Sequence, residues 1–212
     1  MNFLAHTVVS DRLAEPSPAR SLGAALPDLV PMARLRFERA HLPATMAEGV
    51  DCHVLTDRSF HVNAVFLRGV EGIRDGLADR GIGRGPSRAI GHAGWELLLD
   101  GCLVRRPGVR AGFLAALGQA AGAGSAFAVG DRDRWSRFAT MLSTDHWWSG
   151  YDDPLFVAQR LHDRLRHSAR LAFDRRDVDV VAAVLDEARA AIELEADSVI
   201  ESVVAQVGEG RK

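Results

Sequence analysis

The stretch VDCHVLTDRSFH, residues 50–61, predicts an α-helix with ionisable side chains on one face. His53, Asp57 and His61 follow one another at intervals of four residues, and residues four apart lie above one another on a helix. The alternation of apolar and polar residues that would predict a strand is not found at convincing length in the chain. The stretch therefore favours a helical fold with a row of imidazole and carboxylate groups in its first half.

A second stretch, GHAGWELLLD at residues 91–100, predicts another helix with the same four-residue interval between polar side chains: His92, Glu96 and Asp100. His6, near the N-terminus, and Asp28, in the segment LPDL, add two more potential ligands. Imidazole and carboxylate groups together suit Mn, Fe, Zn or Ni. If the two helices face each other, their side chains form a metal site inside a helical bundle, where such sites are common.

A less specific interpretation stays open for the same residues. A single His on a helix is usually a core or surface group, and Asp and Glu on a helix are usually solvated. The neighbours here are apolar, however, with Val50, Val54 and Leu55 around the first row and Ile90, Trp95 and 97–99 around the second. Because charged groups in apolar surroundings are costly unless paired or metal-bound, we favour the metal site over a buried hydrogen-bond network.

The composition is that of an ordinary globular protein, with 47% hydrophobic and 25% charged residues among 212. This length suits one substantial core, and a single helical domain over 1–212 is expected. The net charge of −2 gives no reason to expect a nucleic-acid partner. The two cysteines, Cys52 and Cys102, define neither a disulfide framework nor a zinc motif, which fits a reducing cytoplasm.

The N-terminal segment and the apolar runs of the sequence predict no membrane association. The N-terminal segment lacks the basic start and long apolar run of a signal peptide, and Asp11, Arg12 and Glu15 interrupt it. No uncharged apolar stretch reaches the roughly 18 residues that a membrane span needs. We therefore expect a cytoplasmic protein without a membrane partner, and the sequence leaves the oligomeric state open.

Helical periodicity and breakers predict the order of the elements. The expected helices cover residues 2–13, 19–25 (ending near Pro27 and Pro31), 44–80 (with possible bends at Gly69 and Gly72), 87–105, 109–122, 131–142 (with Asp131 as N-cap), 154–171 and 178–207. The Gly- and Ala-rich residues 118–128 form either a flexible lid or a closely packed contact, and the sequence does not decide between them.

Two further segments have open interpretations. The aromatic cluster STDHWW, residues 143–148, belongs either to the core or to the lip of a cleft. The arginine-rich tract from Arg160 to Arg176 is either a solvated face or a docking face for an acidic partner.

Several segments together resemble the acyl carrier protein phosphodiesterases, a family that is similar to divergent HD-domain phosphohydrolases. The resemblance is carried by MNFLAH (1–6), LGAALPD (22–28), GVDCHVLTD (49–57), WELLLD (95–100) and the segment 142–173 with Trp147 and Tyr151. The N-terminal motif is the most specific of these. The chain departs from the family in the spacing after Asp51 and after Asp100, where Gly101 and Cys102 stand in place of a His.

The resemblance implies an all-α, HD-domain-like helical bundle that hydrolyses a phosphodiester. The implied reaction releases 4′-phosphopantetheine from holo-acyl carrier protein, which would be the partner, with a divalent metal as cofactor: Mn first, with Fe, Zn or Ni as alternatives. Combining the resemblance with the helical rows, we expect His6, Asp28, His53 and His92 to bind the metal. Asp57 and Glu96 are expected as further ligands or as groups that fix the imidazole tautomers.

Asp57, Glu96 and Asp100 are the expected catalytic residues, with Asp100 the candidate general base. Two other functions remain possible on the same residues. One is a phosphohydrolase of HD-like architecture acting on a small nucleotide or phosphoester. The other is a non-catalytic helical protein in which the polar rows form a buried network.

Overall fold

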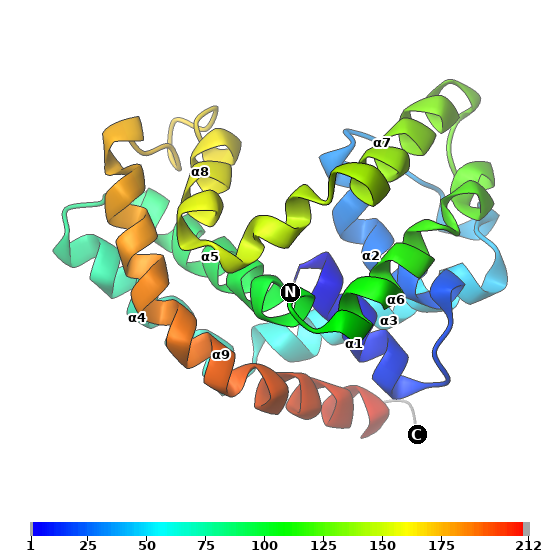
Figure 1. The fold of residues 1–212 in the computed structure, drawn as a ribbon, viewed down its shortest axis with the longest axis horizontal. Coiled ribbons are helices and arrows are strands. Elements are labelled where there is room, and N and C mark those ends of the chain that lie inside the picture. Colours follow the sequence, from blue (N-terminus) through cyan, green and yellow to red (C-terminus); the bar gives the residue numbers. More distant parts are fainter. Residues whose placement is uncertain (1, 210–212) are drawn as a thin grey trace.

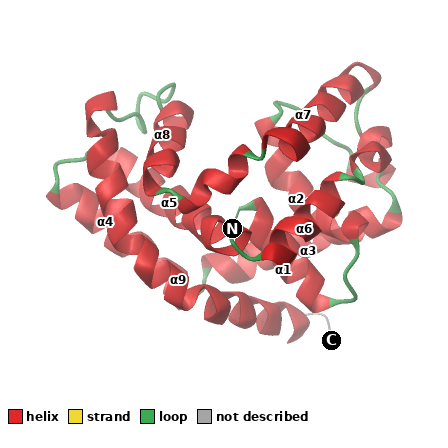
Figure 2. Cartoon of the chain, viewed as in Figure 1, coloured by secondary structure: helices red, strands yellow, loops and turns green. Residues whose placement is uncertain are grey.

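The computed structural model describes residues 2–209, and within this range it is all-α, as the periodicity predicts (Figures 1 and 2). The long C-terminal helix α9 (Val178–Glu209) runs along one side of the molecule, and the other helices pack on it and on each other. Its buried side chains recur at three- and four-residue intervals, from Val181 and Leu185 to Ile200, Val203 and Val207. This stripe makes α9 a base for the single cluster of buried apolar side chains.

The N-terminal helix α1 (Phe3–Leu13) lies in the centre of the core, between α2 (Pro18–Met32), α5 (Arg84–Val104) and α9. Every residue from Phe3 to Ser10 is buried, so this helix has no solvated face over its first two turns. The apolar N-terminal segment is therefore part of the hydrophobic core. It also carries the imidazole of His6 into the interior, with 0% of its surface exposed.

The helices α2 and α3 (Ala44–His61) approach each other closely because glycines lie at their crossing. A Cβ atom on Gly49 would lie 2.1 Å from the carbonyl oxygen of Arg20, and one on Gly23 would lie 2.1 Å from that of Met46. Both positions therefore require glycine. The close crossing brings the face of α3 that carries His53 against α2.

The structure corrects the predicted end of α2. The prolines at 27 and 31 were expected to terminate this helix, yet it continues through both to Met32. Proline removes a hydrogen-bond donor, but Leu26, Leu29 and Val30 are buried and continue the apolar stripe past it. Asp28 is consequently held on a helix.

The predicted helix over 44–80 is two helices. α3 ends at His61, and α4 (Ala64–Asp79) begins after Asn63, whose side chain accepts hydrogen bonds from the backbone N–H groups of Val65 and Phe66. Asn63 is thus an N-cap, and the chain turns there rather than at Gly69 or Gly72. Because of this break, His61 is the last residue of α3 and lies just before the start of α4.

The remaining helices are α6 (Pro107–Leu117), α7 (Arg132–Asp145) and α8 (Pro154–Leu165). The segment 118–128 is packed, because it contains a 3₁₀ helix, Ala120–Ala126, whose Ala120 carbonyl accepts a hydrogen bond from the buried indole of Trp135. Asp131 makes no side-chain capping bond, and α8 ends at Leu165 instead of near 171. No helix of the described residues is long and apolar enough to cross a membrane.

Candidate metal centre

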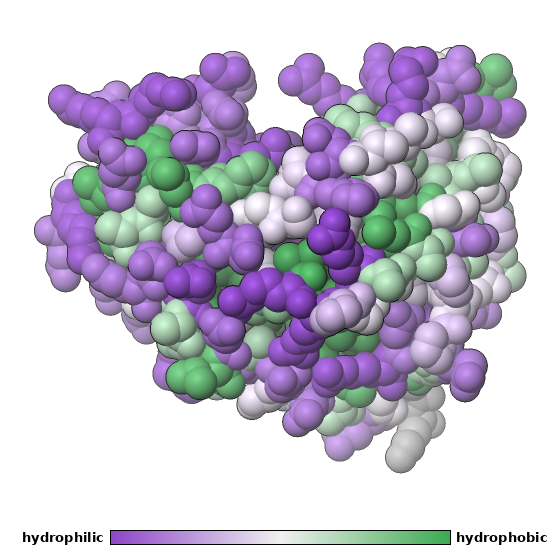
Figure 3. All heavy atoms as spheres, viewed as in Figure 1, coloured by the Kyte–Doolittle hydropathy of each residue, from purple (hydrophilic) through white to green (hydrophobic). Residues whose placement is uncertain are grey.

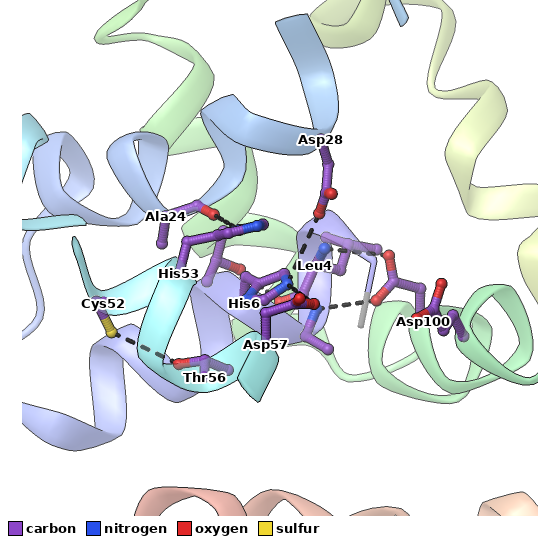
Figure 4. Close-up of polar contacts among 12 residues, drawn as sticks. Leu4, His6, Ala24, Asp28, Cys52, His53, Thr56, Asp57 and Asp100 are labelled. Carbon is purple, nitrogen blue, oxygen red and sulfur yellow. Dashed lines mark hydrogen bonds and ion pairs between the residues drawn. The ribbon is translucent and has the colours of Figure 1, made fainter. Parts of the chain in front are cut away.

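A first cluster of potential ligands forms where α1, α2 and α3 meet. His6 comes from α1, Asp28 from α2 and His53 from α3, and one ligand atom from each lies within 4.8 Å of the others (Figure 4). Nε2 of His6 is 3.9 Å from Oδ2 of Asp28. The rings of His6 and His53 stack, with centroids 3.8 Å apart. Three of the four predicted ligands are therefore in one place.

The tautomer of His53 is fixed by the backbone of α2. Its Nδ1 lies 2.9 Å from the carbonyl oxygen of Ala24, and a carbonyl only accepts, so Nδ1 carries the proton. Burial lowers the pKa of His53, which favours the neutral ring. A neutral imidazole with one nitrogen bonded to a carbonyl has its other nitrogen, Nε2, available as a ligand. This is the usual arrangement of metal-binding histidines.

Asp28 is a carboxylate in an environment that disfavours its charge. Burial raises its pKa well above the ordinary value, and the neighbouring Asp100, Glu96 and Asp57 act in the same direction. Among the described residues, no hydrogen-bond donor reaches its buried Oδ2. A buried carboxylate is stabilised by a cation or by protonation. The donors of this cluster therefore fit a divalent metal ion, which would offset the cost of burying Asp28.

A second cluster forms between the end of α3 and α5. His61 and His92 each place Nε2 at 3.2 Å from the same oxygen of Glu96, Oε1. Burial by itself would raise the pKa of Glu96, but the hydrogen bonds from His61 and His92 outweigh it, so that its pKa is well below the usual range. The hydrogen bond to Glu96 in turn raises the pKa of His61. These three side chains also have the spacing of a metal site.

Asp57 lies between the two clusters. Its Oδ1 is 3.9 Å from Nε2 of His6, and its Oδ2 is 3.2 Å from Nδ1 of His61. The four-residue interval of the sequence is the reason, since His53, Asp57 and His61 lie on one face of α3. One carboxylate thus presents one oxygen to each group of histidines.

Asp100 has a different environment from the other carboxylates. Its side chain is completely buried, and it accepts hydrogen bonds from the backbone N–H groups of Leu4 (3.1 Å) and Ala5 (2.9 Å) at the start of α1. Burial raises its pKa to about 7, although these two hydrogen bonds act in the opposite direction. Asp100 therefore anchors the helix that carries His6, and its role as a general base stays a prediction.

The candidate metal centre borders a cleft of about 650 Å³. Asp28 of the first cluster and Glu96 of the second both line it, together with side chains from α7, α8 and the 3₁₀ helix Trp147–Asp152 between them. Figure 3 shows the surface hollowed between the parts of the molecule that carry α7 and α8. Trp147 lines the cleft, whereas Trp148 is buried, so the aromatic segment serves both the lip and the core.

The structure groups the predicted ligands differently from the single set expected. His92 is not part of the His6–Asp28–His53 group and lies with His61 and Glu96. His61 was in the row that predicted α3 but was not among the expected ligands. Its position at the end of that row, eight residues after His53, was the available signal. The helix break at Asn63, where the chain turns into α4 and leaves His61 at the end of α3, was not predicted from the sequence.

The geometry defines a two-part cluster of histidines and carboxylates, bordering a cleft, in an all-α protein. Comparisons with protein-family models, with curated proteins and with solved structures give no match for this chain.

Proposed function

We propose that this protein is a metal-dependent phosphodiester hydrolase. The observation that supports the proposal is the position of Asp57, with one oxygen toward the cluster of His6 and the other toward that of His61. Two neighbouring groups of nitrogen and oxygen donors that share a carboxylate suit one or two divalent cations. Such ions stabilise the charge of a phosphoryl group and lower the pKa of water. Asp28 and Glu96 connect both groups to a cleft that a substrate can enter.

In this proposal, the residues of the two clusters would have separate roles. His6, Asp28 and His53 would hold a cation, and the Ala24 carbonyl would keep His53 in the tautomer that exposes Nε2. His61, His92 and Glu96 would hold a second cation or, without one, keep a proton between the imidazoles and the carboxylate. Asp57 would accept the proton of the attacking water, because it is a carboxylate between the two clusters. Glu96 would act as a ligand or hydrogen-bond acceptor, since the two imidazoles hold its pKa well below the usual range.

For the substrate, we propose a phosphodiester on a long arm, as in the 4′-phosphopantetheine of holo-acyl carrier protein. A cleft of about 650 Å³ is in the range of sites for small organic molecules. It is open to solvent at the arginines of α8, which an acidic carrier protein could contact. A small nucleotide or phosphoester is the second candidate, since the same cleft could enclose one.

The first test combines metal content with hydrolysis. The wild type, reloaded with Mn, is expected to retain the metal after desalting and to hydrolyse bis-p-nitrophenyl phosphate. Asp57→Asn should lower the rate by at least about 100-fold, by analogy with the loss of a general base. Glu48→Gln, on an exposed position of the same helix, is the matched control and should be unaffected. Retained metal without hydrolysis of any phosphodiester would contradict the proposed activity.

A second measurement separates the hydrolase from a non-catalytic helical protein with a buried polar network. Binding to the native state stabilises it by about 2.7 kcal/mol when the ligand is at a hundredfold excess over its Kd. The melting temperature should therefore rise with the correct ion and fall with EDTA. An unchanged melting temperature with Mn, Fe, Zn and Ni would favour the network.

A further inference from the structure

The cleft beside the metal centre has walls of different chemistry. Asp28 and Glu96 border it from α2 and α5, whereas Arg160 and Arg164 border it from α8. The two arginines are four residues apart on α8, so they lie on one face of the helix, and both are exposed. One further acidic side chain, Asp145, lies at the α7 rim. The α8 wall is therefore the cationic side of the cleft.

Arg160 is held in place by aromatic side chains. Its guanidinium carbon lies 4.3 Å from the centroid of the Trp147 ring, which is the geometry of a cation–π contact. Trp147 packs edge-on against Tyr151, with centroids 5.8 Å apart, and Tyr151 is buried against Phe156. Burial raises the pKa of Tyr151, and the positive charge of Arg160 nearby opposes this effect. The guanidinium is thus pre-positioned at the cleft.

The rest of the cleft is largely apolar. Phe138 and Met141 of α7 face it, as do Leu97 of α5 and Met32 of α2. Met141 is 38% exposed, so part of this apolar surface is in contact with solvent. A compact inorganic ion would leave this surface exposed to water. An organic group attached to a phosphate would cover it.

We propose that the cleft is a recognition site for organic phosphoesters, in which Arg160 binds the phosphate and the apolar α7 wall binds the attached organic group. The proposal rests on the proposed function, because it names the substrate class of the same site. The planar guanidinium matches two oxygens of a phosphate, and an arginine already held over a ring loses less freedom on binding. Arg160 is then a specificity-determining residue, and Trp147 is the residue that positions it.

The test measures equilibrium binding of two non-hydrolysable probes to the Mn-loaded protein by calorimetry. Phenylphosphonate and methylphosphonate share the anionic group and differ in the apolar one. Phenylphosphonate is expected to bind about 10-fold more tightly, because burying part of a phenyl ring contributes roughly the free energy of one decade in Kd. Equal affinities for the two probes would overturn the assignment of the apolar wall.

The variants test the role of Arg160. Arg160→Gln should weaken both probes by about 10-fold or more, the typical effect of losing a hydrogen bond to a charged group. Arg160→Lys should weaken binding less than Arg160→Gln does, because lysine keeps the positive charge but lacks the bidentate geometry of a guanidinium. Trp147→Leu should weaken binding less than Arg160→Gln does. Arg68→Gln, at an exposed position on α4 outside the cleft, is the matched control and should bind both probes like the wild type.

The outcomes separate this inference from the proposed function. Unchanged binding in Arg160→Gln, with phosphodiester hydrolysis intact in the wild type, would overturn the role of Arg160 and leave the hydrolase proposal standing. Binding of phenylphosphonate that depends on Arg160, in a protein that hydrolyses no phosphodiester, would support the recognition site and overturn the hydrolase. A melting curve for each variant distinguishes a local effect from unfolding.

Discussion

At the scale of single residues, the candidate centre depends on how the surroundings of each ionisable group set its charge. Burial lowers the pKa of His53 and raises that of Asp28, so the first cluster holds a neutral ring beside a carboxylate whose Oδ2 meets no hydrogen-bond donor among residues 2–209. In the second cluster, hydrogen bonds to His61 and His92 keep Glu96 ionised. The first cluster therefore has more to gain from a cation, and we expect the tighter metal position there.

Replacing His53 tests this order. His53→Ala removes one nitrogen ligand from the first cluster, and changes even to the groups around metal ligands typically cost about 10–100-fold in affinity. We expect the variant to lose at least that much affinity for Mn, measured by calorimetry. His167→Ala, which removes an exposed histidine outside both clusters, is the control and should leave the affinity unchanged. A His53→Ala protein with wild-type affinity would exclude His53 as a ligand.

The buried Asp100 predicts a pH dependence of stability. Its pKa is about 7 in the folded protein, above the value of about 3.9 expected when unfolded, so the folded state binds the proton more tightly. Its contribution to the free energy of unfolding is therefore greatest below about pH 4 and is lost as the pH rises to about 7. Urea unfolding at several pH values measures this slope.

Asp100→Asn isolates that contribution. The variant should lose the part of the slope between about pH 4 and 7, because an amide does not titrate there. It should also be less stable, by about 1–3 kcal/mol, since the amide oxygen does not serve both N–H donors of α1 and one buried donor is left without a partner. Identical slopes in the two proteins would show that Asp100 keeps an ordinary pKa.

At the scale of elements, the crossing of α2 and α3 sets the geometry of the first cluster. Gly49→Ala would place a Cβ 2.1 Å from a backbone oxygen, so the helices must separate. Overpacking of this kind typically costs about 1–3 kcal/mol. We expect lower stability in urea and, because Asp28 and His53 lie on the separating helices, weaker Mn binding.

The matched control for this variant lies on α4. No atom outside the immediate helix backbone lies within 4 Å of a Cβ built on Gly72, among the described residues. Gly72→Ala should therefore raise the stability by about 0.4–1 kcal/mol through the entropy of the unfolded chain. A loss of stability in Gly72→Ala equal to that in Gly49→Ala would contradict the assignment of the cost to the α2–α3 crossing.

The elements also explain how far the sequence could predict the site. Four-residue intervals were sufficient to place His53, Asp57 and His61 on one face, because that spacing is a local property of a helix. The N-cap at Asn63 and the continuation of α2 past Pro27 were missed, since each depends on packing against other parts of the chain. The division of the ligands into two clusters depends on how α5 lies against α3, which no local pattern specifies.

At the scale of the whole molecule, the distribution of charge bears on the partner. The formal net charge is −2, yet the end of α8 and the residues after it carry several exposed arginines, including Arg164, Arg166 and Arg170. Arg164 lines the cleft, so this basic surface begins at the mouth of the candidate site. An acidic carrier protein docked there would have its phosphodiester arm beside the candidate metal centre.

Charge reversal outside the cleft tests this docking. Arg166→Glu should slow the hydrolysis of holo-acyl carrier protein and spare bis-p-nitrophenyl phosphate, because Arg166 is not among the residues that line the cleft. The rate on the carrier protein should also fall as salt rises, since charges are screened beyond about 8 Å at physiological ionic strength. Arg68→Glu, a charge reversal at an exposed position on α4, is the control and should affect neither substrate.

Equal losses on both substrates in Arg166→Glu would indicate a folding defect. Hydrolysis of the small ester without any activity on carrier protein would instead favour a small phosphoester as the substrate, because the proposed metal chemistry would use the two clusters but not the basic surface.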